Sequence, residues 1–209
     1  MTKWAAEIEE DLRWREAELG SLKLAAAAAP DKSDRQRALL RALWTMLYAH
    51  YEGFFKFCWD LFLNEIERDG CIRDKAVEPV MLLSLSKTFQ ELRADTSSIS
   101  IWDFAHGKLP IALKQPVSFA SRLETKSNLW ANLAKDNNMA VGLPTNEIDK
   151  NSAQINAIVG RRNDIAHGKK LVVGNLDDYS QYELAAMMVM HELAVAVVDQ
   201  LDKRSFAIP

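Results

Sequence analysis

The apolar pattern between residues 34 and 69 constrains the fold more than any other part of the sequence. Apolar and aromatic side chains recur there at spacings of three and four residues, which is the period of one helix face. Gly70 follows the pattern and suits the left-handed residue that ends many helices. A stripe this wide and aromatic predicts a helix at the centre of a bundle. Its members are Leu40, Leu43, Trp44, Leu47, Tyr48, Tyr51, Phe54, Phe55, Cys58, Phe62 and Ile66.

The rest of the chain also favours helix. Glycine and proline are scarce, at 8 and 6 of 209 residues, and strong helix formers are abundant. Gly20 predicts the end of a first helix and Pro79 the start of a later one. Residues 21–33 are ambiguous, because five alanines favour helix and Pro30 then marks a break. The expected helices span residues 2–20, 34–69, 71–94 (one or two short helices), 119–138, 146–166 and 177–201.

The middle of the chain changes character. Residues 95–118 contain threonine, serine, glycine and two prolines, which predict loops with a short extended piece near Ser98 to Trp102. We therefore predict one all-α domain over residues 1–209, a helical bundle. It would carry an N-terminal helical extension at residues 1–30 and an irregular, loop-rich insertion at residues 95–145.

Charge and cysteine content limit the class of protein. The net charge of -3 excludes a chain that coats nucleic acid indiscriminately, so any site for a polyanion must be local. Cys58 and Cys71 make neither a disulfide framework nor a metal-binding motif, which fits a reducing cytosol. The N-terminus lacks a secretory pattern, and the longest apolar run, residues 24–29, is too short to cross a bilayer. We expect a cytoplasmic protein that has no membrane partner.

Residues 161–170 concentrate the reactive side chains. Arg161, Arg162, Lys169 and Lys170 place four cations around His167. Arg162 falls on the apolar stripe of its predicted helix, where an unpaired cation would be costly to bury. It must lie at an opening in the bundle, pair with an acid, or face an anion.

These residue types suit the cleavage of RNA. Histidine can give or take a proton near neutral pH, and an arginine fork can hold a phosphate and offset developing charge. Asn163 and His167 are four residues apart and so share one face of the last turn. RNA supplies its own nucleophile, the 2′-OH, so the reaction requires no metal and no cofactor. The other histidines, His50, His106 and His191, show no metal-ligand spacing.

Two motifs resemble a known family. The run from Arg162 to Gly168, Arg-Asn-Asp-Ile-Ala-His-Gly, resembles the R-x(4–6)-H signature of HEPN-domain ribonucleases. The run from Leu47 to Phe54, Leu-Tyr-Ala-His-Tyr-Glu-Gly-Phe, resembles a helix of the MAE subfamily of HEPN-like nucleases. The resemblance implies a HEPN-type α-helical bundle that forms homodimers, in which two copies of the signature make one metal-independent site. It also implies products with a 2′,3′-cyclic phosphate and a role as a phage-defence effector or as the toxin of a toxin–antitoxin pair.

The resemblance also assigns roles. His167 would act as general acid or base, Arg162 would hold the phosphate, and Asn163 would orient either of them. Arg161, Lys169, Lys170 and Asp164 would lie on the substrate side, with Asp164 setting a histidine tautomer or pairing with Arg161. Glu52 and His50 would support the site from behind. The expected partners are RNA, a second copy of the chain, and an antitoxin or another defence protein.

Other interpretations stay open. The run Ala105-His106-Gly107-Lys108 repeats Ala166-His167-Gly168-Lys169 without an arginine five residues earlier, so those four letters alone indicate nothing. His167 could only stabilise a helix end, and Arg162 could form a structural salt bridge with Glu52. Tyr48, Tyr51 and Phe54 are expected in the core, and His50 is expected to be structural. The alternative function is a dimeric module that binds RNA, a nucleotide or a protein without cleaving it.

Overall fold

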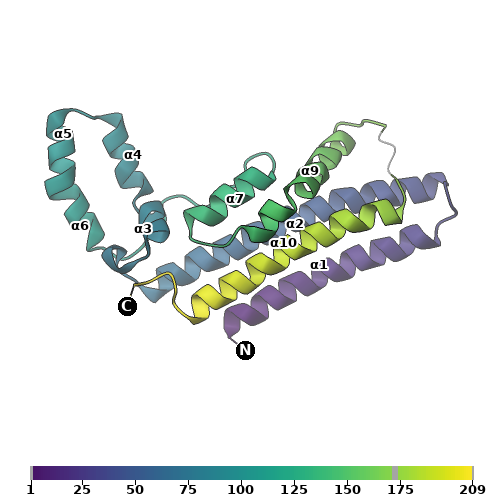
Figure 1. Cartoon of the computed structure of the whole chain (residues 1–209), viewed down its shortest axis with the longest axis horizontal. Coiled ribbons are helices and arrows are strands. Elements are labelled where there is room, and N and C mark those ends of the chain that lie inside the picture. The colour runs from purple at the N-terminus through teal and green to yellow at the C-terminus, as the bar shows by residue number, and fades with distance from the viewer. Residues whose placement is uncertain (1, 171–173, 209) are drawn as a thin grey trace.

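Three long helices form the body of the protein in the computed structural model, which describes residues 2–170 and 174–208. The helices α1 (Lys3–Ala28), α2 (Asp34–Asp69) and α10 (Leu176–Asp202) lie side by side along the molecule (Figure 1). Each of the three contacts the other two. The described residues contain no β-strand, only two isolated bridges, which confirms the predicted all-α fold.

Helix α2 lies at the centre, as the sequence predicts. The Ser33 hydroxyl accepts a hydrogen bond from the Gln36 N–H at its start, and Gly70 ends it with a φ of 74°. Every member of the predicted stripe from Leu40 to Ile66 is buried. Each such side chain contributes about 1.5–3 kcal/mol through burial, so α2 supplies much of the stability of the bundle.

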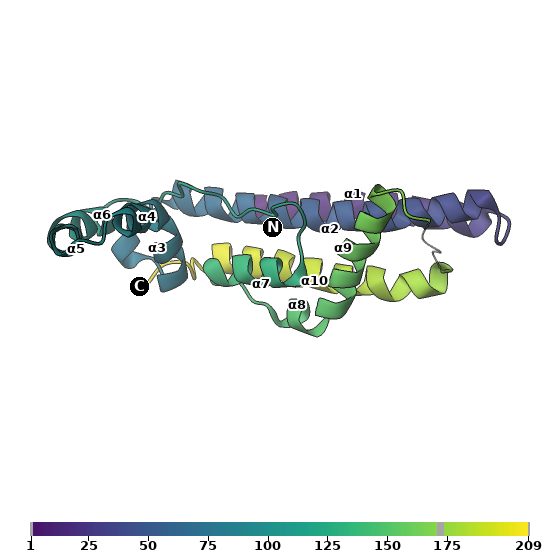
Figure 2. The ribbon, with the colours of Figure 1, turned by 90° about the horizontal axis from the view of Figure 1, so that it is seen from above.

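A second group of helices covers one side of this body. Helix α9 (Ser152–Ala166) crosses α2 and α10, and α7 (Ala131–Ala140) and α8 (Asn146–Lys150) pack beside it (Figure 2). The α9 side chains Ile155, Ile158 and Val159 are fully buried. This packing fixes the direction in which the last turn of α9 points.

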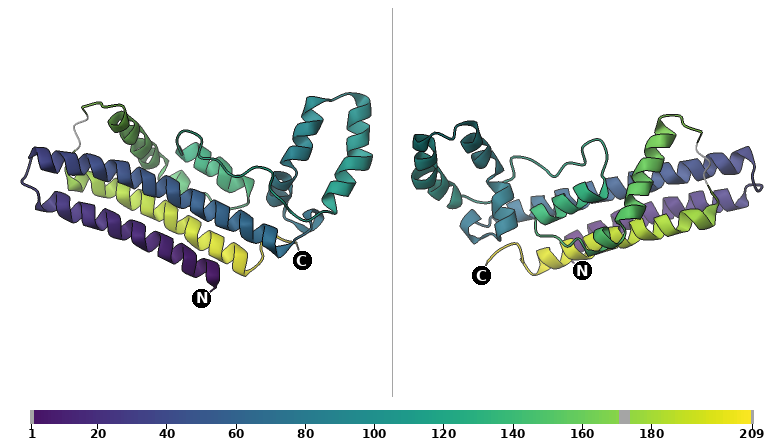
Figure 3. Two further views of the ribbon diagram at one scale, coloured as in Figure 1. Left: turned by 180° about the vertical axis from the view of Figure 1, so that it is seen from behind. Right: turned by 45° about the horizontal axis from the view of Figure 1, so that its top comes forward.

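The middle of the chain forms an arm, and its outer part, residues 86–113, stands clear of the bundle (Figure 3). Its root is tied to the C-terminal residues, because the Val77 N–H donates to the Phe206 carbonyl. Phe89 and Phe104 pack against each other across the arm, with tilted rings whose centres are 5.7 Å apart. Its elements are η1 (Arg73–Lys75), α3 (Glu78–Ser84), α4 (Ser86–Ala94), α5 (Ser98–Asp103), the π-helical turn η2 (Phe104–Lys108) and α6 (Leu109–Leu113).

Two predictions in the first half of the chain were wrong. Helix α1 does not end at Gly20, because Leu19 and Ala26 pack into the core on either side of it, and the space beside Gly20 is open. Residues 98–102 are helical, not extended, since the Ser97 hydroxyl caps α5 by accepting from the Ser100 N–H. The segment 95–145 is therefore rich in helix. Its status as an insertion, and that of residues 1–30 as an extension, stays a prediction.

The helix predicted at residues 119–138 is also wrong in its first half. The segment runs along α2, because the Phe119 N–H donates to Glu67 and the Leu129 N–H donates to the Tyr48 hydroxyl. Residues 48 to 67 of α2 span about 28 Å. The chain from 119 to 129 covers about 33 Å when extended but only about 15 Å when helical. An extended path is therefore required, and α7 begins only at Ala131.

The last two predicted helices need smaller corrections. The helix expected from 146 to 166 is divided at Asn151, whose side-chain amide donates to the Glu147 carbonyl and carboxylate and so ends α8. The last helix begins at Leu176, because Asn175 and Asp178 form a capping box. The start of the loop expected before it falls on residues 171–173, outside the described residues.

Helix α10 has the length and composition of a helix that can cross a membrane, the single such helix in the part of the chain that the structure describes. Its buried face, which includes Val189, Leu193 and Val197, packs in the core with α1 and α2. A helix at the centre of a bundle has the same apolar composition, so core packing accounts for its sequence.

Candidate active site

The last turn of α9 ends in a defined hydrogen-bonded motif that presents His167. Gly168 adopts a φ of 72°, and its N–H donates to the Ile165 carbonyl at 3.1 Å. The Lys169 N–H donates to the Asp164 carbonyl at 2.9 Å. These two bonds close the helix in the manner of a Schellman motif, so the predicted end of this helix at residue 166 is confirmed. His167 is exposed at the helix end.

Arg162 lies one turn earlier, on the side of α9 that faces α2. Its guanidinium carbon is 3.8 Å from the centre of the Tyr48 ring on α2. Its Nε is buried and has no hydrogen-bond partner among the described residues, and no ion pair with Glu52 forms within that set. The guanidinium is thus oriented by an aromatic ring and not by a carboxylate, which leaves its charge available to an anion.

Tyr48 is itself held rigidly. It is buried, and its hydroxyl accepts a hydrogen bond of 3.0 Å from the buried Leu129 N–H. Burial raises the pKa of Tyr48, and the Leu129 N–H and Arg162 oppose that rise. The phenol therefore stays neutral at physiological pH. The predicted core position of Tyr48 is confirmed, and the residue links α2, α9 and the segment before α7.

Arg161 is engaged by two aromatic rings. Its guanidinium carbon lies 4.2 Å from the centre of the Trp44 ring on α2 and 4.7 Å from that of Tyr182 on α10. Its Nη2 also donates to the Tyr182 hydroxyl at 3.4 Å. These contacts attach α9 to both long helices, which gives Arg161 a structural role that the sequence did not indicate. Its contact with substrate stays a prediction.

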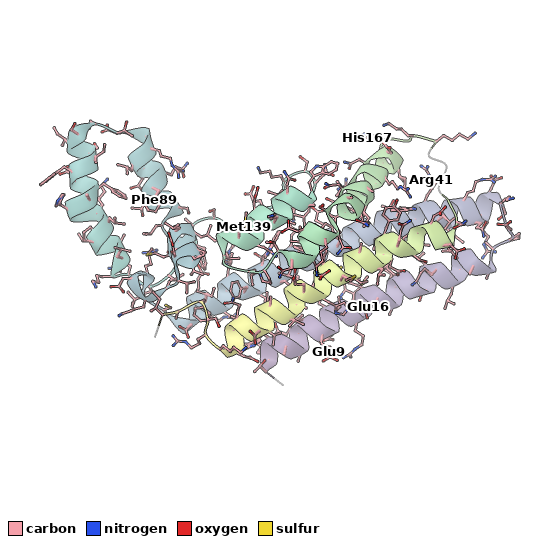
Figure 4. All side chains as sticks on the ribbon, viewed as in Figure 1. Glu9, Glu16, Arg41, Phe89, Met139 and His167 are labelled. Atoms are coloured by element: carbon pink, nitrogen blue, oxygen red, sulfur yellow. The ribbon has the colours of Figure 1, made fainter. Side chains whose placement is uncertain are left out.

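The residues after His167 are fastened to the protein in two ways. Lys169 Nζ lies 2.6 Å from Asp164 Oδ1, so Asp164 pairs with Lys169 and not with Arg161 as expected. Arg41 on α2 donates to the Lys169 carbonyl at 3.0 Å, and Figure 4 shows Arg41 on α2 beneath the end of α9 that carries His167. Lys170 is exposed beyond this point.

The two residues expected to support the site lie on different faces of α2. Glu52 is half-buried and close enough to Tyr48 to raise its pKa. His50 faces α1, where its Nε2 lies 2.8 Å from Glu18 Oε2. Its predicted support of the site is wrong, because two residues of helix turn a side chain by about 200° from Tyr48. The structural role considered for it is the one observed.

His50 belongs to a buried polar cluster between α1 and α2. Arg15 on α1 is 8% exposed and is bound by Asp11, with Nε 2.7 Å from Oδ2. Its Nη1 donates to the His50 carbonyl at 3.4 Å. A Cβ on Gly53 would lie 2.9 Å from that same Nη1. Gly53 thus leaves space for a guanidinium between α1 and α2.

Sequence reasoning missed three residues that hold the site together. Arg41, Trp44 and Tyr48 share the face of α2 that contacts α9, and their spacing of three, four and seven residues could have indicated it. Leu129 gave no signal, because its contribution is a backbone N–H. Over residues 2–170 and 174–208, no group of three or more histidine, cysteine, aspartate or glutamate side chains is placed to hold a metal ion.

The geometry presents an exposed imidazole just past the end of α9 and an oriented guanidinium five residues earlier on the same helix. Such a pair can bind a phosphodiester and transfer a proton at one of its oxygens. Comparison with known sequences gives one family match, to the family described as MAE_28990-like HEPN, over residues 4–206. The match includes the first helix and the arm. No curated protein and no solved structure matches the chain.

Proposed function

This chain belongs to the MAE_28990-like HEPN family, and from that membership we propose that it is a metal-independent endoribonuclease. HEPN domains are RNA-related modules and are commonly ribonucleases. The observation that carries the proposal is the last turn of α9, where exposed His167 follows Arg162 by five residues and Arg162 is oriented by Tyr48.

The proposed reaction is an in-line displacement at phosphorus. The 2′-OH loses its proton to a base and its oxygen bonds to phosphorus, while the bond to the 5′-oxygen breaks and that oxygen takes a proton. The products are a 2′,3′-cyclic phosphate and a 5′-hydroxyl. Arg162 offsets the charge that develops on the phosphoryl oxygens, and His167 transfers protons as a general acid or base.

The site requires a second copy of the chain. Attack and departure occur on opposite sides of phosphorus, so one imidazole cannot serve both ends of a concerted step. A symmetric dimer supplies two His167 side chains, one as base and one as acid, with an arginine from each copy. Exposure of the helix end supports this arrangement. We further propose that the dimer acts in the cytoplasm as a phage-defence effector or as a toxin held in check by a partner protein.

A cleavage assay with total RNA and EDTA tests the activity. Wild-type protein should cleave, and the products should carry a 5′-hydroxyl that polynucleotide kinase labels directly. His167→Ala and Arg162→Ala should each lower the rate by at least about 100-fold. His106→Ala is the matched control, because His106 has the same local sequence, Ala-His-Gly-Lys, in the arm. Cleavage that is unchanged in both site variants would refute the assigned site, and intact RNA that stays bound would favour a binding module.

The dimer has its own test. Sedimentation should show a dimer, and specific activity should fall on dilution below the dissociation constant. Activity that is proportional to protein concentration down to the monomer would exclude a site shared between two copies.

A further inference from the structure

A small hollow lies where the extended segment meets the start of α7. Its volume is about 380 Å³, and Lys126, Asn128, Trp130, Asn132 and Asp136 are among the residues that line it. A hollow of this size is at the lower end of the range for small-molecule sites, and one nucleobase is small enough to fit such a site. No part of the proposed reaction uses these residues.

The wall of the hollow is linked to the candidate active site through Tyr48. Leu129, between Asn128 and Trp130, donates its N–H to the Tyr48 hydroxyl, and the Tyr48 ring carries Arg162. The Ala131 N–H donates to Asn156 on α9 at 3.1 Å. One buried tyrosine therefore separates the wall of the hollow from the guanidinium, and the wall is fixed to both α2 and α9.

The lining suits a flat, uncharged ligand with a polar edge. Trp130 is 38% exposed and so offers ring surface for stacking. Asn128 is half-buried in the lining of the hollow, and a side-chain amide can hydrogen-bond the polar edge of a ligand. Lys126 and Asp136 cancel in charge, so the hollow as a whole does not select an anion. These are the properties of a nucleobase site and not of a phosphate site.

We propose that the hollow holds an unstacked base of a single-stranded RNA whose neighbouring phosphate lies at Arg162. The base stacks on Trp130 and its edge bonds to the Asn128 amide. The choice of RNA as the ligand rests on the proposed function. The hollow would select which base lies beside the cleaved bond.

Binding can be measured without cleavage in a His167→Ala background. The probe is a fluorescein-labelled, mixed-sequence 12-nucleotide single-stranded RNA, followed by anisotropy. Trp130→Ala should weaken binding by about tenfold, as expected for loss of one base–aromatic stack. Trp130→Phe should restore most of it, which separates stacking from misfolding. The matched control is Trp102→Ala, because Trp102 in the arm is more exposed, at 64%, and should change binding by less than about twofold.

The inference and the proposed function can fail separately. If Trp130→Ala binds RNA as tightly as Trp102→Ala, or if no RNA binds at all, the base site is refuted. If wild-type protein cleaves but Trp130→Ala keeps the same KM and base preference at the cut, the base site is refuted and the nuclease stands. If binding depends on Trp130 but wild-type protein does not cleave, the base site stands and the nuclease is refuted.

Discussion

Substitution of Gly53 by alanine tests whether the guanidinium of Arg15 occupies the groove between α1 and α2. Gly53 lies in the interior of α2, where alanine should stabilise the helix by about 1 kcal/mol on intrinsic grounds. The structure predicts the opposite result in the wild-type protein. The new Cβ would stand 2.9 Å from Arg15 Nη1, closer than a side-chain carbon is found to approach.

The size of the effect follows from the contacts of Arg15. The guanidinium must move, and it is held by Asp11 and by the His50 carbonyl. Crowding of a packed interior costs about 1–3 kcal/mol, and the gain in helix propensity offsets about 1 kcal/mol of that. We expect Gly53→Ala to lower the free energy of unfolding by about 1 kcal/mol.

A double-mutant cycle isolates the contact. In an Arg15→Ala background the space is empty, so Gly53→Ala should raise the free energy of unfolding by about 1 kcal/mol. The coupling between the two positions is then about 2 kcal/mol. The measurement is urea unfolding of the four proteins, with equal dependence on urea as the check on two-state behaviour. If Gly53→Ala stabilises both backgrounds by the same amount, Arg15 does not approach α2 at this position.

Further predictions concern the site and the α1–α2 interface. Tyr48→Phe keeps the ring under Arg162 but leaves the buried Leu129 N–H unpaired, so the free energy of unfolding should fall by about 1–3 kcal/mol in urea titrations; a change below about 0.5 kcal/mol would contradict the bond. Gly168→Ala places a Cβ at a φ of 72° and should cost about 1 kcal/mol in the same assay, whereas an unchanged midpoint would argue against the left-handed turn. Burial and Arg15 lower the pKa of His50. Below about pH 6.5 the unfolded chain therefore binds a proton at this histidine that the folded protein does not. The free energy of unfolding should be constant above about pH 6.5 and should fall below it by at most about 1.4 kcal/mol per pH unit. His50→Gln should remove that dependence, and an identical pH profile in the variant would show that another group is responsible.

The sequence was a good guide wherever one helix face is buried along its whole length. The stripe of α2 and the end of α9 at Gly168 both follow from local periodicity and turn chemistry, which act over a few residues. The path from Phe119 to Leu129 could not be predicted in this way. It is extended because of the distance that it must cover along α2, and that distance exists only in the folded protein.

In the candidate site, too, local sequence predicts some features and not others. The positions of Arg162 and His167 at the same end of one helix follow from their spacing. The partners of the charged residues do not, because Arg161 is held by Trp44 and Tyr182 from two other helices, and Arg162 by Tyr48. Periodicity shows that a cation lies on a buried face. It does not reveal whether an acid or an aromatic ring meets it there.

The motif from Leu47 to Phe54 contacts two different neighbours of α2, and this affects which of its positions can vary in the family. Tyr48 contacts Arg162 of α9 and Glu52 raises the pKa of Tyr48, whereas His50 contacts Glu18 and Gly53 accommodates Arg15, both on α1. We therefore expect the two pairs to vary independently among relatives. A relative that has lost the first helix should be free to replace the histidine and the glycine while it keeps the tyrosine. An alignment in which all four positions change together would contradict this expectation, because it would indicate that they are conserved for one shared reason.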